Sequence, residues 1–409
     1  MRRLGRGLAW ALCALWVGIG LRGLAILATS GDGQPVASLR YLTDDLGVYS
    51  ARMQRLFPEG HVFTAALTGL AWANAARDPA LHDEALAGAR RALAIVESPV
   101  ALETFRSAGG LEHGMFYHAW HTRLLAAVVG LSGGDDAGET SRLAAACRPL
   151  GAALGSTGGA VDSYPGQAWP ADNVVGAAAL MQCGRLVDAA YADVARAWLG
   201  RARQREDPAT GLLPHTTWLP DARGSSAALM AAFVAEIDPA YAAVQHARLV
   251  DAFATRMGGL LPALREYRPG ADGPGDVDSG PLVLGASAPA SVVGIASARA
   301  TGDAETAAAL GASSEALGLA TSWGGRRRYL FGQLPVGDAF LAWARTTPPA
   351  APSETGAPSE TGAPSETGAP SETATFAGWR LRWGLASLLL LSLGLAGSAR
   401  LWQRRPRAM

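Results

Sequence analysis

Two acidic residues in loop-like segments are the strongest candidates for chemistry in this sequence. Asp172 lies in SYPGQAWPADN and Asp278 in GDVDSGPLVLG, where glycine and proline indicate loops. Two carboxylates from separate loops can divide the roles of proton donor and proton acceptor, as they do in glycoside hydrolysis. We therefore predict that Asp172 and Asp278 are catalytic. Asp276 is two residues from Asp278, so in an extended chain one of them can face a pocket while the other ties the loop down.

Both carboxylates also have simpler interpretations. Asp172 lies at the start of a helical pattern, where a carboxylate stabilises the helix through its dipole and its free N–H groups. The loop around Asp278 has the acidic side chains and the flexible backbone that calcium binds. The sequence leaves these alternatives open.

Three histidines, His113, His118 and His121, lie close together in GLEHGMFYHAWHTRLL. Neutral imidazole suits acid–base work near pH 7, and we predict that His118 is a third catalytic residue. The spacing differs from the HExxH pattern of helical zinc sites, so we expect no bound metal and no cofactor. Packing and loop capping are the simpler roles for these residues.

Other residues predicted to bind a ligand are aromatic or polar, and they lie in or beside the same loops. Such side chains around a concave mouth are typical of a small-molecule or glycan site, although ordinary surface loops carry them too. The predicted ligand-binding residues are Tyr117, Trp120, His121, Tyr164, Trp169, Asn173, His215 and Trp218.

The segments between these loops have the pattern of paired helices. Alanine-rich stretches carry apolar residues at three- and four-residue spacing, with almost no alternating pattern of strands. Short links join the helices of a pair, and long loops separate successive pairs. Six pairs that close into a ring form an (α/α)6 toroid, which we predict as the all-α fold; an open solenoid of helix pairs is the alternative. The predicted helices are 36–56, 61–77, 79–97, 114–131, 138–152, 171–184, 188–205, 223–236, 239–257, 288–301, 303–319 and 335–345.

In such a ring every long loop precedes the first helix of a pair, so the loops gather at one end. We therefore expect His118, Asp172 and Asp278 to share one funnel-shaped pocket there. Separate surface loops with incidental aromatic residues are the alternative.

Both ends of the chain predict contact with a membrane. Residues 1–30 begin with three arginines within the first seven positions, and an apolar run that contains Arg22 follows, which is typical of a signal anchor or of a cleaved signal peptide. Residues 379–409 hold a second apolar stretch, framed by tryptophans and followed by arginines. By the positive-inside rule we expect a two-pass protein of the cell membrane, with both termini cytoplasmic and the toroid domain at 31–347 extracytoplasmic. A buried first helix and a cytoplasmic body are the alternative.

Composition and repeats complete the domain plan. Residues 348–378 repeat the unit APSETG, which cannot form a core and predicts a semi-extended stalk. The 409-residue chain has 35 basic and 35 acidic residues, and this zero net charge argues against a nucleic-acid partner. The expected partners are the lipid bilayer and a small-molecule or glycan ligand. Among the three cysteines, at most one disulfide of the body is possible, between Cys147 and Cys183.

The alternation of helical hairpins with long loops resembles the six-hairpin glycosidase-like superfamily, which includes glycoside hydrolases, sugar epimerases and the linalool dehydratase/isomerase group. The segments YPGQAWPADN and DVDSGP, the latter followed by a helix ending in ARATGD, look similar to segments of that superfamily. The resemblance implies the toroid fold. Members of the dehydratase group use Cys and Glu near the pocket, where this sequence has Trp169 and Pro170, so their mechanism is not carried over.

These patterns favour a membrane-anchored, extracytoplasmic carbohydrate-active enzyme that is a hydrolase, a lyase or an epimerase. A second hypothesis is a linalool dehydratase/isomerase-like lyase that acts on a small apolar alcohol, with Tyr117 and His118 as proton donors. A third is a non-catalytic binding protein tethered to the membrane.

Overall fold

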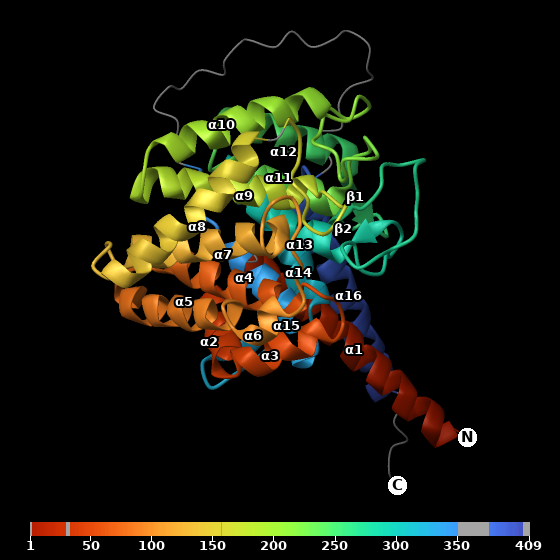
Figure 1. Cartoon of the computed structure of the whole chain (residues 1–409). Coiled ribbons are helices and arrows are strands. Elements are labelled where there is room, and N and C mark those ends of the chain that lie inside the picture. The colour runs from red at the N-terminus through yellow and green to blue at the C-terminus, as the bar shows by residue number, and fades with distance from the viewer. Residues whose placement is uncertain (1, 30–32, 157, 351–375, 404–409) are drawn as a thin grey trace.

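The computed structural model describes every residue except 1, 30–32, 157, 351–375 and 404–409. The described part is mainly helical, as predicted, with sixteen α-helices and five short strands (Figure 1). Most of the stalk predicted at 348–378 lies outside the described residues. The helices of the body are α2 (Pro35–Asp44), α3 (Leu46–Gln54), α4 (Gly60–Ala75), α5 (His82–Val96), α6 (Pro99–Leu102), α7 (Gly114–Leu131), α8 (Ala137–Ser156), α9 (Pro170–Leu186), α10 (Ala190–Ala202), α11 (Gly224–Val234), α12 (Pro239–Phe253), α13 (Ala288–Thr301), α14 (Ala304–Leu317) and α15 (Pro335–Thr346).

Six helices of the body contact one another in a closed order. Contacts run from α4 through α7, α9, α11, α13 and α15, and α15 returns to α4. Each of these six also packs against a second helix, in the same order α5, α8, α10, α12, α14 and α2. Helices of the first set are apolar on nearly every side, as in α4, where all but one residue from Gly60 to Trp72 are buried. In contrast, α5 buries a single stripe and keeps a polar face for solvent.

Aromatic side chains from four helices of the first set meet between them. Phe63 of α4 packs edge-on against Trp120 of α7, with ring centroids 5.1 Å apart. Trp120 in turn meets Phe233 of α11 at 5.5 Å, and Phe233 stacks on Trp343 of α15 at 5.3 Å. Since Trp120 is fully buried, side chains fill the space between these helices.

One predicted helix is divided in the structure. The segment 36–56 forms α2 and α3 rather than one helix, because the backbone leaves the helical region at Asp45, with φ −133° and ψ 37°. Aspartate has a low helix propensity, and two of them stand together at this point. The bend lets α2 pack on α15 while α3 packs on α4.

Short strands occur where the sequence predicted helix or loop. The end of the predicted helix 239–257 forms β1 (Ala254–Met257), which pairs with β2 (Leu261–Arg265) through a glycine turn. A short β3 (Ala286–Ser287) adds to β2, and all pairs are antiparallel. A separate hairpin joins β4 (Thr321–Trp323) to β5 (Arg326–Arg328). These strands are two to five residues long, too short for an alternating pattern to reveal.

A disulfide joins Cys147 of α8 to Cys183 of α9. The two helices also pack against each other, so the bond reinforces an existing contact. Cys13 is free. Structural disulfides persist in oxidising compartments, and this bond is therefore compatible with a body outside the cytoplasm.

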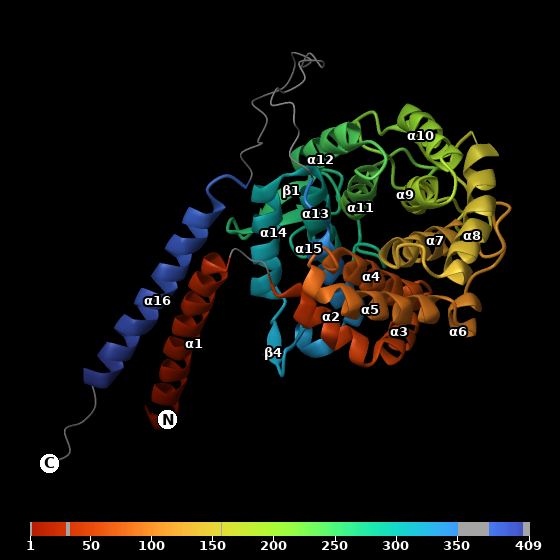
Figure 2. The same ribbon diagram turned by 90° about the vertical axis from the view of Figure 1, so that its left-hand side faces the viewer.

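The two terminal helices are long and apolar enough to cross a membrane. The candidate spans are Gly7–Ala28, within α1 (Arg2–Ala28), and the whole of α16 (Trp379–Gln403). Most of each span is exposed. The helices lie side by side and antiparallel, and the start of α1 and the end of α16 point away from the body together (Figure 2). This arrangement is compatible with a two-pass membrane protein.

Small residues allow these two helices to approach closely. The indole Nε1 of Trp383 donates a hydrogen bond of 3.1 Å to the carbonyl oxygen of Gly23. A Cβ atom on Gly20 would lie 2.7 Å from the Ser387 carbonyl oxygen, and one on Gly23 would overlap the Ser387 side chain. Glycine at position 20 is therefore required for this contact, and a side chain at position 23 would displace Ser387; close approach at small residues is typical of helix pairs in membranes.

Candidate functional site

Residues from three loops approach one another where the chain enters α4, α9 and α13. Glu59 immediately precedes α4, Tyr164 lies in the loop before α9, and Asp172 is in the first turn of α9. Asp278 lies in the loop before α13. The Tyr164 hydroxyl donates a hydrogen bond to the Glu59 carboxylate, and Asp172 interacts electrostatically with both Glu59 and Asp278. We call Glu59, Asp172 and Asp278 the acidic cluster.

Asp172 is a buried member of the acidic cluster, with only 8% of its surface exposed. Its Oδ2 accepts a hydrogen bond of 2.5 Å from the Ser163 hydroxyl. Burial raises the pKa of Asp172 to about 7; the Ser163 bond opposes this rise, and the charges of Glu59 and Asp278 add to it. Trp169, the residue before α9, provides no side-chain cap for the helix. The hydrogen-bond partner of Asp172 is the hydroxyl group of Ser163, in the loop before α9.

Asp278 is exposed to solvent on one side and desolvated by the surrounding protein on others. Its residue surface is exposed, yet desolvation by the surrounding protein is the main reason why its pKa rises to about 6. The charges of Asp276 and Glu59 raise this pKa further. Protein therefore surrounds part of Asp278 while the rest of the residue reaches solvent. Its carboxylate makes no hydrogen bond or ion pair with the described residues, which leaves it available to a ligand.

Asp276 has a structural role in the same loop. Its Oδ1 accepts the backbone N–H groups of Asp278 at 3.1 Å and of Ser279 at 3.0 Å, and its Oδ2 pairs with Arg223 at 2.6 Å. Desolvation pushes the pKa of Asp276 up, but the bonds from Arg223 and Ser279 hold it below its ordinary value. Asp276 therefore ties the loop down and leaves Asp278 free.

Arg223, directly before α11, connects this loop to a buried carboxylate. Its Nε lies 2.9 Å from Oε1 of Glu266, and its guanidinium lies 4.9 Å from the centre of the Tyr267 ring. Glu266 is fully buried and also accepts hydrogen bonds from the backbone and hydroxyl of Ser225. The charge of Arg223 is thus shared by Glu266 and Asp276. Through its ion pair with Asp276, Arg223 positions the loop that carries Asp278.

Three of the predicted ligand-binding residues, His215, Trp169 and Trp218, are linked to Arg223 by successive side-chain contacts. His215 Nε2 lies 3.2 Å from Arg223 Nη1, while burial and the Arg223 charge lower the pKa of His215 to about 4. His215 is therefore neutral at pH 7. Trp169 packs edge-on against both His215, at 5.0 Å, and Trp218, at 5.2 Å. These contacts form a continuous path from Arg223, the partner of Asp276, to Trp218.

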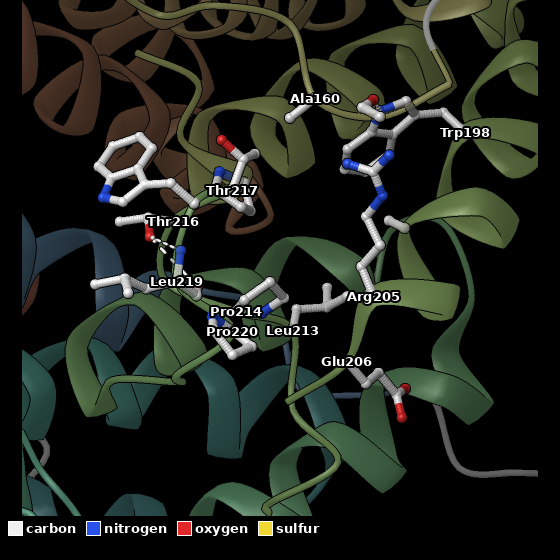
Figure 3. Close-up of a pocket in the computed structure, with 14 residues that line it drawn as sticks. Ala160, Trp198, Arg205, Glu206, Leu213, Pro214, Thr216, Thr217, Leu219 and Pro220 are labelled. Carbon is white, nitrogen blue, oxygen red and sulfur yellow. Dashed lines mark hydrogen bonds between the residues drawn. The ribbon is translucent and has the colours of Figure 1, made fainter. Parts of the chain in front are cut away.

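A cavity of about 380 Å³ lies at the end of this path (Figure 3). Its lining includes Trp198, Arg205 and Trp218. Arg205 extends toward Trp198 on one side, and Thr216 and Leu219 lie on the other (Figure 3). No residue of the acidic cluster lines it. Of the predicted aromatic residues, Trp218 alone lines this cavity, and Trp169 reaches it only through its contact with Trp218.

The histidine segment of α7 forms a separate group. His121 Nε2 pairs with Glu97 Oε1 at 2.9 Å, and Tyr117 stacks on His121 with ring centroids 5.4 Å apart. Both ring nitrogens of His118 are buried and have no hydrogen-bond partner among the described residues. Burial, with the charges of His121 and His113, lowers the pKa of His118 to about 4. None of these contacts joins His118 to the acidic cluster.

The remaining predicted residues have packing or loop contacts. Trp120 belongs to the buried aromatic group between the helices, so its ring has no free face. Asn173 accepts a hydrogen bond of 2.7 Å from the backbone N–H of Val161 and donates one of 2.9 Å to its carbonyl oxygen. Asn173 therefore holds the loop before α9 in place. Tyr164 is joined to the acidic cluster through Glu59.

Sequence reasoning placed Glu59 and Arg223 in the loops of the predicted funnel but gave neither a role, and it did not select Ser163. Glu59 directly precedes a helix start at the same end as Asp172. The role of Arg223 depends on Glu266, which only the folded chain brings near. Within the described ranges, no three His, Cys, Asp or Glu side chains are grouped so that they could hold a metal ion.

No family model matches this chain, and no curated protein matches its sequence. Its function therefore has to be inferred from the geometry of the site.

Proposed function

We propose that the body is an (α/α)6 toroid of the six-hairpin glycosidase-like type. The closed order of contacts from α4 to α15 supports this fold, as does the second helix packed against each member. In such a ring α4, α9 and α13 start at the same end, which accounts for the meeting of Glu59, Asp172 and Asp278. We further propose that α1 and α16 span the cell membrane, with both termini cytoplasmic and the body outside. The shared direction of their ends and the disulfide of the body support that topology.

On this fold we propose a carbohydrate-active enzyme that transfers protons at the acidic cluster. The observation that carries the proposal is that two desolvated carboxylates, Asp172 in the first turn of α9 and Asp278 in the loop before α13, interact electrostatically and have raised pKa values, about 7 and about 6. Asp172 is buried and is therefore held more strongly in its protonated form, whereas Asp278 reaches solvent and ionises more readily. Asp172 is then the acid and Asp278 the base.

With Asp172 as the acid and Asp278 as the base, each of the three reaction classes has a proton donor and a proton acceptor. In hydrolysis, Asp172 gives its proton to the leaving glycosidic oxygen, and Asp278 accepts a proton from the attacking water. In a lyase or an epimerase, Asp278 takes a proton from carbon and Asp172 supplies one. Glu59, held by Tyr164, contributes negative charge that keeps both pKa values raised. His118 has no step in this scheme.

The test is a substrate screen with the full-length protein in lipid nanodiscs, using neutral and uronate-containing oligosaccharides. We expect Asp172→Asn and Asp278→Asn each to lower turnover of a substrate found in this screen by about 100-fold or more. Asp193→Asn is the matched control, because the Asp193 side chain is 82% exposed on α10. If both site variants kept wild-type turnover, the acid–base assignment would be wrong.

A tethered binding protein is the second candidate, and the cavity beside Trp218 favours it, since no residue of the acidic cluster lines that cavity. In that case a ligand from the same screen binds without being converted. Trp218→Ala should then weaken binding while Asp278→Asn leaves it unchanged. The dehydratase/isomerase-like alternative has less support. Burial and the Glu97 charge raise the pKa of Tyr117, which makes it a poorer proton donor, and His118 is neutral at pH 7.

A further inference from the structure

The chain between α14 and α15 exposes an unusual number of apolar side chains. Trp323, at the tip of the β4–β5 hairpin, is 90% exposed, and Phe331 is 58% exposed. We call residues 317–334 the hairpin segment. Its other exposed large apolar residues are Leu317, Leu319, Leu330 and Leu334. Single exposed apolar residues are normal, but a concentration in one short segment indicates a contact surface.

The backbone of the hairpin segment is strained where these side chains are presented. Leu319, Leu330 and Phe331 have φ values of 46°, 47° and 56°, which bulky residues rarely adopt. Such conformations persist only where surrounding contacts enforce them. Here Arg326 pairs with Asp44, and Arg327 pairs with Glu315, so β5 is fixed to the body, and β4 is held through its pairing with β5. The exposure of the apolar residues is therefore imposed by the fold.

Two contacts set the direction of α14 relative to the terminal helices. Arg380, at the start of α16, pairs with Glu305 at the start of α14. Arg22 of α1 donates a hydrogen bond of 2.5 Å to the carbonyl oxygen of Glu315, near the end of α14. Arg22 lies well before the body-side end of α1 at Ala28, about 9 Å along the helix axis.

The hairpin segment consequently leaves the body on the side of the terminal helices. Because α14 runs along the pair from the start of α16 toward Arg22, its end is the part of the helix nearer the proposed bilayer. Figure 2 shows α14 leading into β4, and the hairpin points in the same direction as the N-terminal half of α1. In Figures 1 and 2, α12 lies on the opposite side of the body from the N terminus.

The charges of the hairpin fit a lipid surface. β5 consists of Arg326, Arg327 and Arg328, and Arg328 is exposed and forms no ion pair with the described residues. Tryptophan prefers the headgroup region of a bilayer, and arginine binds lipid phosphate. A tryptophan at the tip with an exposed arginine on the adjacent strand therefore combines an inserting group with a phosphate-binding group.

We propose that the hairpin segment rests in the headgroup layer of the bilayer that α1 and α16 span, with Trp323 inserted and Arg328 facing lipid phosphate. This inference rests on the proposed two-pass topology. The hairpin adds a contact point beside the helix pair, and with it the body cannot swing freely about its two tethers. The loop end with the acidic cluster is then held at a fixed height and angle above the membrane.

The test places a fluorescent label at single positions of the full-length protein in nanodiscs of phosphatidylcholine and phosphatidylglycerol. In a Cys13→Ser background, Trp323→Cys, Val244→Cys and Leu389→Cys are each labelled with nitrobenzoxadiazole. Val244 is a matched control, being an apolar residue of α12 with 45% exposure, and Leu389 reports the proposed span of α16. Because Trp323 is almost fully exposed, its replacement removes no core contact.

We expect lipid-borne spin labels to quench the fluorophores at 323 and 389, with blue-shifted emission at both. Aqueous iodide should quench only the fluorophore at 244. Quenching by lipid at 389 but by iodide at 323 would overturn the hairpin inference and leave the topology standing. Iodide quenching at 389 would overturn the topology itself. A third outcome is that neither quencher reaches the fluorophore at 323 and that its self-quenching grows with the number of protein molecules per disc. This result would show that a second copy of the chain covers the hairpin, and it would also overturn the inference.

Discussion

The Ser163 hydroxyl donates a 2.5 Å hydrogen bond to the buried carboxylate of Asp172. This bond favours the ionised carboxylate, whereas burial favours the neutral acid, and burial prevails, since the pKa of Asp172 is about 7. Ser163→Ala removes the contact that opposes burial. We therefore expect the pKa of Asp172 to rise above 7 in this variant.

The Ser163→Ala prediction can be measured with or without a substrate. A carbon-13 NMR titration of the aspartate carboxyl groups reports the pKa of Asp172 directly. If Asp172 is the proton donor, activity falls as pH rises through this pKa, so the alkaline limb of the pH–rate profile moves to higher pH. Ser156→Ala, an exposed serine at the end of α8, should leave both measurements unchanged. An unshifted titration in Ser163→Ala would show that the hydrogen bond has no influence on Asp172.

Protonation of Asp172 also makes the stability of the fold depend on pH. Its pKa in the folded protein, about 7, lies above the ordinary value of 3.8, so the folded state favours the protonated form. The associated stabilisation is fully present below about pH 4 and is lost as pH rises through 7. Three pKa units correspond to about 4 kcal/mol, which is an upper bound for this loss.

Asp172→Asn lacks this ionisation and should lose less stability between pH 5 and pH 8 than the wild type. Urea unfolding of the full-length protein, followed by tryptophan fluorescence at both pH values, measures the difference. Asp193→Asn should follow the wild type, because its carboxylate is exposed. Equal pH dependence in Asp172→Asn and the wild type would contradict a raised pKa at this position.

The helices that surround this site were largely predictable, for a reason visible at their ends. The predictions 114–131 and 288–301 coincide with α7 and α13. Both helices are apolar on nearly every side, and glycines with positive φ, Gly114 and Gly302, mark the start of α7 and the end of α13. The loops with Asp172 and Asp278 were found because their glycine and proline content separates them from these helices.

The contacts between loops could not be predicted from spacing. Helical periodicity places His118 and Trp120 on α7, but it does not say which neighbouring helix each will meet. Trp120 enters the buried aromatic group, whereas the ring of His118 meets that of Tyr117, its neighbour in the chain. Likewise, the pairing of Arg223 with Glu266 depends on β2 following α12, and the sequence pattern had predicted helix up to residue 257.

The disulfide between Cys147 and Cys183 should contribute strongly to the stability of the body. It closes a loop with a sequence separation of 36 residues, for which the loss of chain entropy in the unfolded state corresponds to about 4 kcal/mol. Replacing both cysteines with serine, or adding a reductant, should lower the urea midpoint accordingly. Cys13→Ser is the control, because Cys13 is free and lies in α1. A midpoint that does not respond to reductant would contradict the bond.

The packing of α1 against α16 can be tested by an engineered disulfide to the native Cys13. A Cβ atom on Gly397 would lie 2.6 Å from Sγ of Cys13, so Gly397→Cys brings a second thiol within bonding reach. Mild oxidation in membranes should then join the helices. Cleavage at a protease site inserted after Ala350 should leave one species on a non-reducing gel and two on a reducing gel.

Substitutions at two glycines of α1 show whether this cross-link depends on the close packing. Adding Gly23→Leu should reduce the yield severalfold, because any side chain there overlaps Ser387 and pushes the helices apart. Adding Gly18→Leu should not, since no atom lies within 4 Å of a Cβ at that position. Equal yields in the two leucine variants would mean that the helices meet through a different face, and the antiparallel packing at Gly23 would have to be abandoned.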